Sequence, residues 1–309
     1  MKKVGLILQS YLKEKIPLES IVLSFILAAL AVFFQYRYDL KDTFLGDMEE
    51  KAAYLTRAVV FFGIPLLLYL GIWAFRDKGK KKFITPQLGL LLLLTLFAFA
   101  LRIGFFEHAS WVSMNFENWN YGIRLTNAMI LGPIMCILPI IWWFVVDRKD
   151  EKRLYGCSLK GVDWKAYFIL LGLMVPLIIA AASTNDFIRY YPKVARLFNE
   201  SHPSQSGQIA LYELFYGLDF VYIEFFFRGF LVIAFARFLG PVSIPFAALM
   251  YCTIHFGKPL GETISSWFGG MLLGILVMET RSIAGGIVVH MGIAWLMELG
   301  GWLGRLLSD

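Results

Sequence analysis

The sequence predicts an all-α fold, a polytopic transmembrane helical bundle with about 8–9 membrane helices. Three observations support this prediction. Of the 309 residues, 58% are apolar and only 17% are charged, and the mean hydropathy is +0.64. A soluble domain of this length has more charge and fewer long apolar runs. We therefore expect a multi-pass integral membrane protein. The three cysteines show neither metal-site nor disulfide spacing.

Nine apolar runs define the predicted helices, and the long runs meet the roughly 20 residues that a membrane-spanning helix needs. One run, 242–255, is short, so we expect that it does not cross the whole bilayer. The predicted helices are 18–36, 54–75, 86–106, 126–146, 165–183, 208–238, 242–255, 260–279 and 283–303.

Basic residues in the loops predict the orientation. The loops on one side of the predicted bundle hold 15 Lys and Arg residues, and the loops on the other side hold 7. The first set is 1–16, 76–82 and 147–165, and the second is 37–53, 107–124 and 184–207. Because Lys and Arg gather in cytoplasmic loops, the N-terminus is expected in the cytoplasm. The net charge of +6 then reflects topology and anionic lipid headgroups, and it does not indicate a nucleic-acid partner.

Ionisable residues deep in the membrane occur mainly in the last four predicted helices. Glu224 and Arg228 lie in the middle of the run 208–238, where charged residues usually pair, face a cavity and mark function. Their i, i+4 spacing places them on one helix face, where they can pair. Glu224 is therefore either a structural ion-pair partner of Arg228 or a general base that accepts a proton from water.

Two histidines lie in similarly apolar surroundings. A glycine and a proline follow His255, so it is expected on a last helical turn, beside irregular backbone that membranes tolerate only around protein or a cavity. His290 follows a glycine-rich first turn, and small residues let helices approach closely. His255 is either a core histidine or a functional residue, and His290 is either an interhelical hydrogen-bond donor or a ligand. His108 and His202 lie in predicted outer loops, and we assign them no role.

The order of these motifs resembles the CPBP family, the CAAX-protease and bacteriocin-processing (Abi) intramembrane peptidases. The chain has Glu-x-x-x-Arg-Gly at 224–229, aromatic-x-x-x-His at 251–255, and then His290. The resemblance implies a CAAX-protease-like core in the C-terminal half, at 161–309, after N-terminal transmembrane helices without a motif at 1–160. It also implies proteolysis in or at the membrane, with a glutamate and histidines activating water.

Carried over residue by residue, the resemblance makes Glu224, His255, His290 and Arg228 the catalytic residues, with Arg228 positioning Glu224. Two positions depart from the family pattern of Glu-Glu-x-x-x-Arg and His-x-x-x-Asn (or His). The first glutamate of the pair falls at Ile223, and the last polar residue falls at Ala294. Loss of an oxyanion donor costs on the order of 100- to 1000-fold in rate, and loss of a general base costs roughly 100- to 10,000-fold.

Both a metallo- and a glutamic mechanism remain open at this point. A thermolysin-like zinc site takes two histidines and a glutamate, which would be His255, His290 and Glu224. That site needs a separate base, for which Glu262 is the candidate because it is close to His255 in sequence. Glu213 lies about 16 Å from Glu224 along the same helix. The metal-free mechanism uses Glu224 as base and His290 to stabilise the oxyanion.

The first expectation is an intramembrane endopeptidase that hydrolyses a peptide bond of a membrane-associated protein or peptide, in a bacterial-type cytoplasmic (inner) membrane. Prenylated CAAX peptides, bacteriocin leaders and other membrane proteins are the candidate substrates. The alternative is a catalytically silent relative that binds membrane peptides or regulates a partner. A proton-coupled transporter with Glu224 as relay is the third hypothesis, but the sequence lacks the paired broken helices that are typical of transporters.

Overall fold

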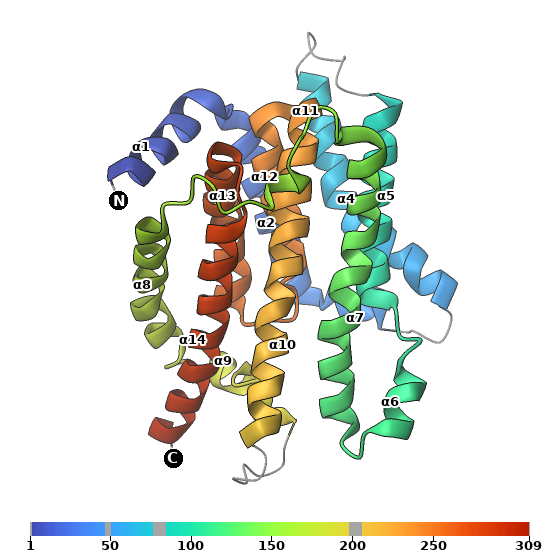
Figure 1. The fold of residues 1–309 in the computed structure, drawn as a ribbon, viewed down its shortest axis with the longest axis vertical. Helices are drawn as coiled ribbons and strands as arrows, with labels where there is room; N and C mark the ends of the chain where they lie inside the picture. Colours follow the sequence, from blue (N-terminus) through green and yellow to red (C-terminus); the bar gives the residue numbers. More distant parts are fainter. Residues whose placement is uncertain (1, 47–50, 77–84, 198–205, 309) are drawn as a thin grey trace. The chain divides into compact units, whose positions relative to one another are not determined.

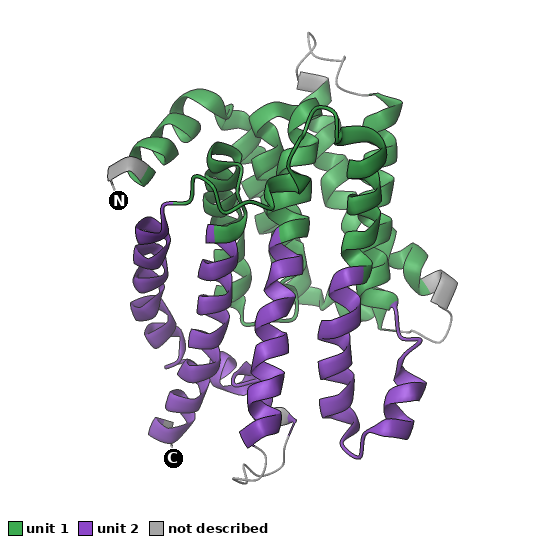
Figure 2. Ribbon diagram, viewed as in Figure 1, with its two compact units in different colours: residues 1–104, 134–162, 225–284 green, residues 105–133, 163–224, 285–309 purple. Residues whose placement is uncertain are grey.

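The computed structural model describes residues 2–46, 51–76, 85–197 and 206–308, and these residues form helices and turns but no strand. Eight helical stretches among them are long and apolar enough to cross a membrane. The predicted all-α, multi-pass fold is therefore confirmed. The chain divides into two compact units (Figure 2).

Each unit combines early and late parts of the chain. Unit 1 comprises residues 1–104, 134–162 and 225–284, and unit 2 comprises residues 105–133, 163–224 and 285–309. The two units defined by packing therefore differ from the two segments, 1–160 and 161–309, that the sequence motifs predict. The division near residue 160, which separates helices without a motif from helices with one, stays a prediction.

Most of the α-helices of both units are labelled in Figure 1. Those of unit 1 are α1 (Lys2–Ser10), η1 (Tyr11–Lys15), α2 (Leu18–Tyr38), α3 (Leu40–Leu45), α4 (Lys51–Arg76), α5 (Pro86–Gly104), η3 (Trp143–Asp147), η4 (Leu154–Gly156), η7 (Phe225–Ala234), α11 (Phe235–Leu239), η8 (Gly240–Val242), α12 (Ser243–Thr253) and α13 (Leu260–Thr280). Those of unit 2 are α6 (Ala109–Asn115), α8 (Trp164–Ala181), α9 (Asn185–Tyr190), η5 (Val194–Arg196) and α10 (Ser206–Glu224). Two helices belong to unit 2 only in part, α7 (Trp119–Trp142) up to Pro133 and α14 (Ala284–Ser308) from Gly285.

Most predicted helices agree with the observed ones within a few residues at each end. The helix predicted at 126–146 begins earlier, because α7 starts at Trp119. The run predicted as one helix at 208–238 consists of α10, the π-helix η7 and α11. The short run at 242–255 corresponds to α12, which has 11 residues and is too short to cross a bilayer alone.

The core of unit 1 is α12, in which every residue is buried. It is joined to α11 by a turn at Gly240, whose φ of +56° is a conformation that glycine adopts without strain. Both α2 and α13 pack against α12. Ser24 of α2 donates a hydrogen bond to the Pro245 carbonyl at 2.7 Å and accepts one from Trp267 of α13 at 2.9 Å. These buried hydrogen bonds join three helices around the centre of the unit.

The loop at 148–158 braces η7. Its Tyr155 is fully buried, with ring centroids 5.6 Å from Phe230. The Tyr155 hydroxyl donates to Asp147 Oδ2 at 2.6 Å, and Arg237 pairs with the same carboxylate. Burial and this hydrogen bond raise the pKa of Tyr155. A Cβ on Gly229 would lie 2.6 Å from the Tyr155 carbonyl oxygen, so the glycine of the Arg-Gly motif allows the loop to pack closely.

In unit 2, α14 packs against both α8 and α10. A Cβ on Gly217 of α10 would lie 2.5 Å from the ring of Trp295, whose Nε1 donates to the Glu213 carbonyl at 3.1 Å. A Cβ on Gly292 of α14 would lie 2.6 Å from Leu171 of α8. Glycines therefore set the close approach of α14 to its two neighbours.

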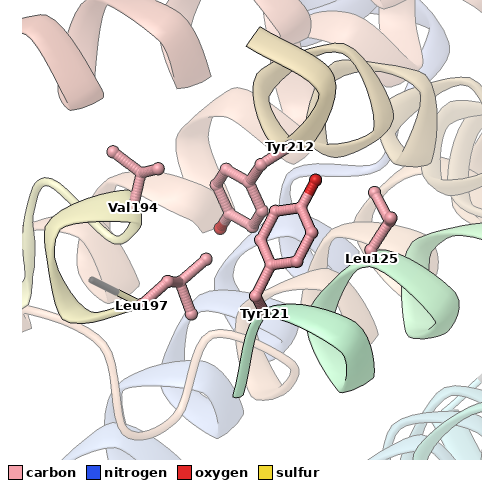
Figure 3. Packing of buried hydrophobic residues seen from close by; sticks show 5 residues of the cluster. All are labelled: Tyr121, Leu125, Val194, Leu197 and Tyr212. Atoms are coloured by element: carbon pink, nitrogen blue, oxygen red, sulfur yellow. The ribbon is translucent and has the colours of Figure 1, made fainter. Parts of the chain in front are cut away.

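A hydrophobic cluster fixes the start of α10 in unit 2. It joins α7, the segment around η5 and α10, and it consists of Tyr121, Leu125, Val194, Leu197 and Tyr212 (Figure 3). The two tyrosine rings lie beside each other between the aliphatic side chains (Figure 3). This packing anchors the N-terminal part of α10, the helix that ends at Glu224.

Candidate active site

Glu224 is the last residue of α10, and its side chain is fully buried. The backbone changes from α-helical to π-helical at Phe225, and π-helical turns often occur at functional sites. A buried carboxylate is costly unless hydrogen bonds or opposite charges satisfy it. The neighbours of Glu224 therefore decide what its carboxylate can do.

One such neighbour in unit 2 is His290 of α14, whose Nδ1 lies 2.9 Å from Glu224 Oε1. An ionised carboxylate can only accept a hydrogen bond, so Nδ1 donates to it. This leaves Nε2 as the ring nitrogen that can bind or release a second proton. Phe220, one turn before Glu224, packs on the imidazole with ring centroids 4.4 Å apart. Side chains of α10 thus fix both the position and the tautomer of His290.

In unit 1, Tyr251 lies between Arg228 and His255. The Arg228 guanidinium carbon is 3.8 Å from the centroid of the buried Tyr251 ring, a cation–π contact. The Tyr251 and His255 ring centroids are 4.6 Å apart, and the Tyr251 carbonyl accepts a hydrogen bond from His255 Nδ1 at 2.8 Å. His255 therefore presents Nε2 for chemistry. The expected pairing of Arg228 with Glu224 stays a prediction.

The sequence predicts His255 on a last helical turn, but α12 ends at Thr253 and His255 lies just past it, in the irregular segment. Its carbonyl accepts a hydrogen bond from Thr263 Oγ1 at 2.8 Å. Glu262, in the first turn of α13, has Oε1 4.0 Å from His255 Nε2 and 2.7 Å from Lys258 Nζ. The structure thus brings the candidate second carboxylate next to His255, where it is paired with a lysine.

Two side chains near the end of α2 hold the segment that follows His255. The Tyr36 hydroxyl donates to the Lys258 carbonyl at 2.5 Å, and Lys41 Nζ donates to the Phe256 carbonyl at 3.2 Å. Burial lowers the pKa of Lys41. These contacts tie the backbone on the C-terminal side of His255 to α2, through Tyr36, and to α3, through Lys41, which restricts its movement.

The three predicted zinc ligands are divided between the units, with Glu224 and His290 in unit 2 and His255 in unit 1. Among the residues that the structure describes, no three His, Cys, Asp or Glu side chains lie together in a way that would hold a metal ion. The side chains that each unit brings together therefore do not make the three-ligand set of a catalytic zinc. The zinc site stays a prediction.

Sequence reasoning did not single out Phe220, although its position one turn before Glu224 places both on one face of α10. His108, which we expected in an outer loop without a role, is buried, and its Nε2 donates to Asn127 Oδ1 at 2.7 Å. His202 lies outside the described residues. Ile223 and Ala294, the two departures from the family pattern, are both buried apolar side chains.

Comparison with known proteins gives one match. The family model for the type II CAAX prenyl endopeptidase Rce1-like family matches residues 206–296, the segment with Glu224, Arg228, His255 and His290. Neither the curated proteins nor the solved structures contain a match to the chain. The family match confirms the resemblance that the motifs indicate: residues 206–296 are similar to the Rce1-like domain of the CPBP family of CAAX-protease-like membrane peptidases.

Proposed function

We propose that this protein is an intramembrane endopeptidase that hydrolyses a peptide bond of a membrane-associated protein or peptide. The observation that supports this most is the hydrogen-bonded pair of the buried Glu224 and the partly buried His290, which lies within the Rce1-like segment. General-base hydrolysis needs a carboxylate or imidazole that is held in place and can accept a proton from water. A buried carboxylate with an oriented imidazole meets that need.

In the proposed reaction, Glu224 accepts a proton from water while the water oxygen bonds to the carbonyl carbon of the scissile peptide. The carbonyl oxygen becomes an oxyanion, which the Nε2–H groups of protonated His255 and His290 stabilise. Glu224 then transfers the proton to the leaving nitrogen as the C–N bond breaks. The products are a new carboxyl terminus and a new amine. Arg228 positions Glu224 in this scheme.

Metal content distinguishes this glutamic form from the zinc form, in which Glu224, His255 and His290 are ligands and Glu262 is the base. The measurement is elemental analysis of the purified protein, with the His255→Ala/His290→Ala double variant beside it. Near-stoichiometric zinc that disappears in the variant supports the zinc form. Protein that has no bound zinc and still cleaves its substrate supports the glutamic form.

The test of the proposed function compares membranes from cells that produce the wild type or Glu224→Gln. Mass spectrometry of protein N-termini should reveal cleaved membrane proteins in the wild-type sample that are absent with the variant. Glu213→Gln is the matched control, because it makes the same change elsewhere on α10 and should leave the cleavage products unchanged. Identical N-termini in the wild-type and Glu224→Gln samples would contradict the proposal.

A second candidate function is a catalytically silent relative that binds membrane peptides. The observation that favours it is the pair of buried apolar residues, Ile223 and Ala294, at positions where the family pattern has polar groups. Under this alternative, Glu224→Gln changes no N-terminus, but a peptide crosslinked to the wild type is still recovered with the variant. The same pair of samples therefore separates the two functions.

For the location of the protein, we propose a bacterial-type cytoplasmic membrane with the N-terminus in the cytoplasm. The distribution of Lys and Arg among the loops supports this orientation. The proposed substrates then share the bilayer with the enzyme, and neither the charge pattern nor the family implies a nucleic-acid partner.

A further inference from the structure

Gly286 lies in the first turn of α14, one turn before His290 on the same face. A Cβ built on this residue would lie 2.5 Å from Glu224 Oε2 and 3.4 Å from Glu224 Cδ, and it would meet no other described neighbour within 4 Å. Ordinary contacts of a Cβ begin at about 3.4 Å. The Glu224 carboxylate therefore occupies the space that any larger residue at position 286 would fill.

The backbone gives no separate reason for a glycine here. Gly286 does not have a positive φ, so alanine could adopt the same helical conformation. In a helix interior, glycine is less stabilising than alanine, because it loses more conformational freedom on folding. Room for the Glu224 carboxylate is the structural reason for glycine at this position.

The same approach places the carboxylate against the first turn of α14. Backbone amides of a first turn lack acceptors within their own helix and carry partial positive charge, which attracts a carboxylate. One face of α14 thus supplies two features for Glu224. His290 donates a hydrogen bond to Oε1. Gly286 has no side chain, so Oε2 can lie close to the backbone of α14.

From this geometry we infer that Gly286 is a positioning residue for Glu224, holding the carboxylate in register with His290. Its effect on catalysis rests on the proposed function, whereas its effect on the placement of Glu224 does not. A methyl group at 286 displaces the carboxylate by up to about 1 Å, and a displacement of that size costs on the order of 100-fold in rate.

The test is a set of double-variant cycles on the full-length protein, read out as thermal unfolding midpoints in detergent. Gly286→Ala should lower the midpoint. Glu224→Asp draws the carboxylate back by one C–C bond, about 1.5 Å, so adding Gly286→Ala to Glu224→Asp should lower the midpoint little further. If Gly286→Ala alone does not fold, Glu224→Ala/Gly286→Ala is compared with Glu224→Ala instead. The two midpoints should then be nearly equal, because no carboxylate remains at position 224.

Two control glycines isolate the carboxylate from general packing. Gly292 of α14 faces Leu171 rather than Glu224, so the loss from Gly292→Ala should persist in full with Glu224→Asp. Gly172 of α8 has no neighbour within 4 Å of its added Cβ, so Gly172→Ala should not lower the midpoint. An equal loss from Gly286→Ala with Glu, Asp and Ala at position 224 would overturn the inference.

The effect of Gly286 on catalysis is measured by the kinetics of cleavage of a peptide that the wild type cleaves. Gly286→Ala should lower kcat about 100-fold with little change in KM, and Gly172→Ala should change neither. A Gly286→Ala enzyme with wild-type kcat would overturn the positioning role. If the wild type cleaves nothing, the proposed function fails, while coupling between positions 224 and 286 in the stability cycle still supports the placement of Glu224.

Discussion

The hydroxyl of Tyr155 offers a direct test of how the loop at 148–158 holds η7. Tyr155→Phe removes a single oxygen, and the remaining ring keeps its contacts with Phe225 and Phe230, whose centroids are 6.2 and 5.6 Å away. The change deletes the 2.6 Å hydrogen bond to Asp147. Asp147 keeps Arg237 as an ion-pair partner, so its charge stays balanced.

The magnitude follows from the burial of these groups. The Asp147 side chain is 2% exposed, so its carboxylate cannot replace the lost hydroxyl with bulk water. Hydrogen bonds to charged groups contribute roughly 1.5–3 kcal/mol to stability, and Arg237 moderates the loss here because it still pairs with the carboxylate. We therefore expect a cost of about 2 kcal/mol, which corresponds to a fall of roughly 4–8 °C in the unfolding midpoint.

Thermal unfolding of the full-length protein in detergent, followed by tryptophan fluorescence, measures this difference. Tyr38→Phe is the matched control, because Tyr38 is 55% exposed and exposed substitutions usually change stability by less than about 0.5 kcal/mol. A Tyr155→Phe midpoint equal to that of Tyr38→Phe would refute the bracing role of the Tyr155–Asp147 hydrogen bond.

Three further predictions concern other parts of the molecule. Burial and a hydrogen bond to Glu279 raise the pKa of Tyr11 to about 12. The unfolded chain loses this proton near pH 10 while the folded protein keeps it, so stability should fall between pH 10 and 12 by up to about 1.4 kcal/mol per pH unit. Tyr11→Phe should make this fall shallower, and an unchanged slope in urea titrations would be the contrary result. Gly217→Ala should cost about 1–3 kcal/mol by overpacking against Trp295, and Trp295→Phe should restore part of the loss in melting experiments. A membrane-impermeant maleimide should label only Cys157, because the other two cysteines are buried. Labelling should occur in inside-out vesicles and accelerate as pH rises, since partial desolvation of the exposed Cys157 raises the pKa of its thiol. Labelling from outside intact cells would contradict the orientation.

The helices were largely predictable because apolar runs of membrane length leave few alternatives. The internal structure of the run at 208–238 was not. No proline interrupts it, so the sequence gives no local sign that the backbone becomes π-helical at Phe225. The requirement for Gly229 comes from the Tyr155 carbonyl, which belongs to a distant part of the chain and leaves no trace in local periodicity.

The candidate site was predictable in its members and less so in its contacts. Glu224, His255 and His290 stand out because ionisable residues are rare at membrane depth. Local spacing suggests only Arg228 as a partner for Glu224. The structure instead shows a hydrogen bond between the carboxylate and His290, 66 residues away. Helix spacing reports neighbours along one helix, and contacts between helices depend on packing. Gly286 illustrates this limit, since only the structure shows that it faces Glu224.

The kinetics of purified Glu224→Gln on a peptide that the wild type cleaves test the central claim most directly. Glutamine keeps the size of the side chain and an oxygen that accepts the His290 Nδ1 hydrogen bond, but it is not a base. With an unchanged unfolding midpoint, kcat/KM should fall roughly 100- to 10,000-fold. Cleavage by Glu224→Gln at the wild-type rate would contradict the account, because water would then be activated without this carboxylate.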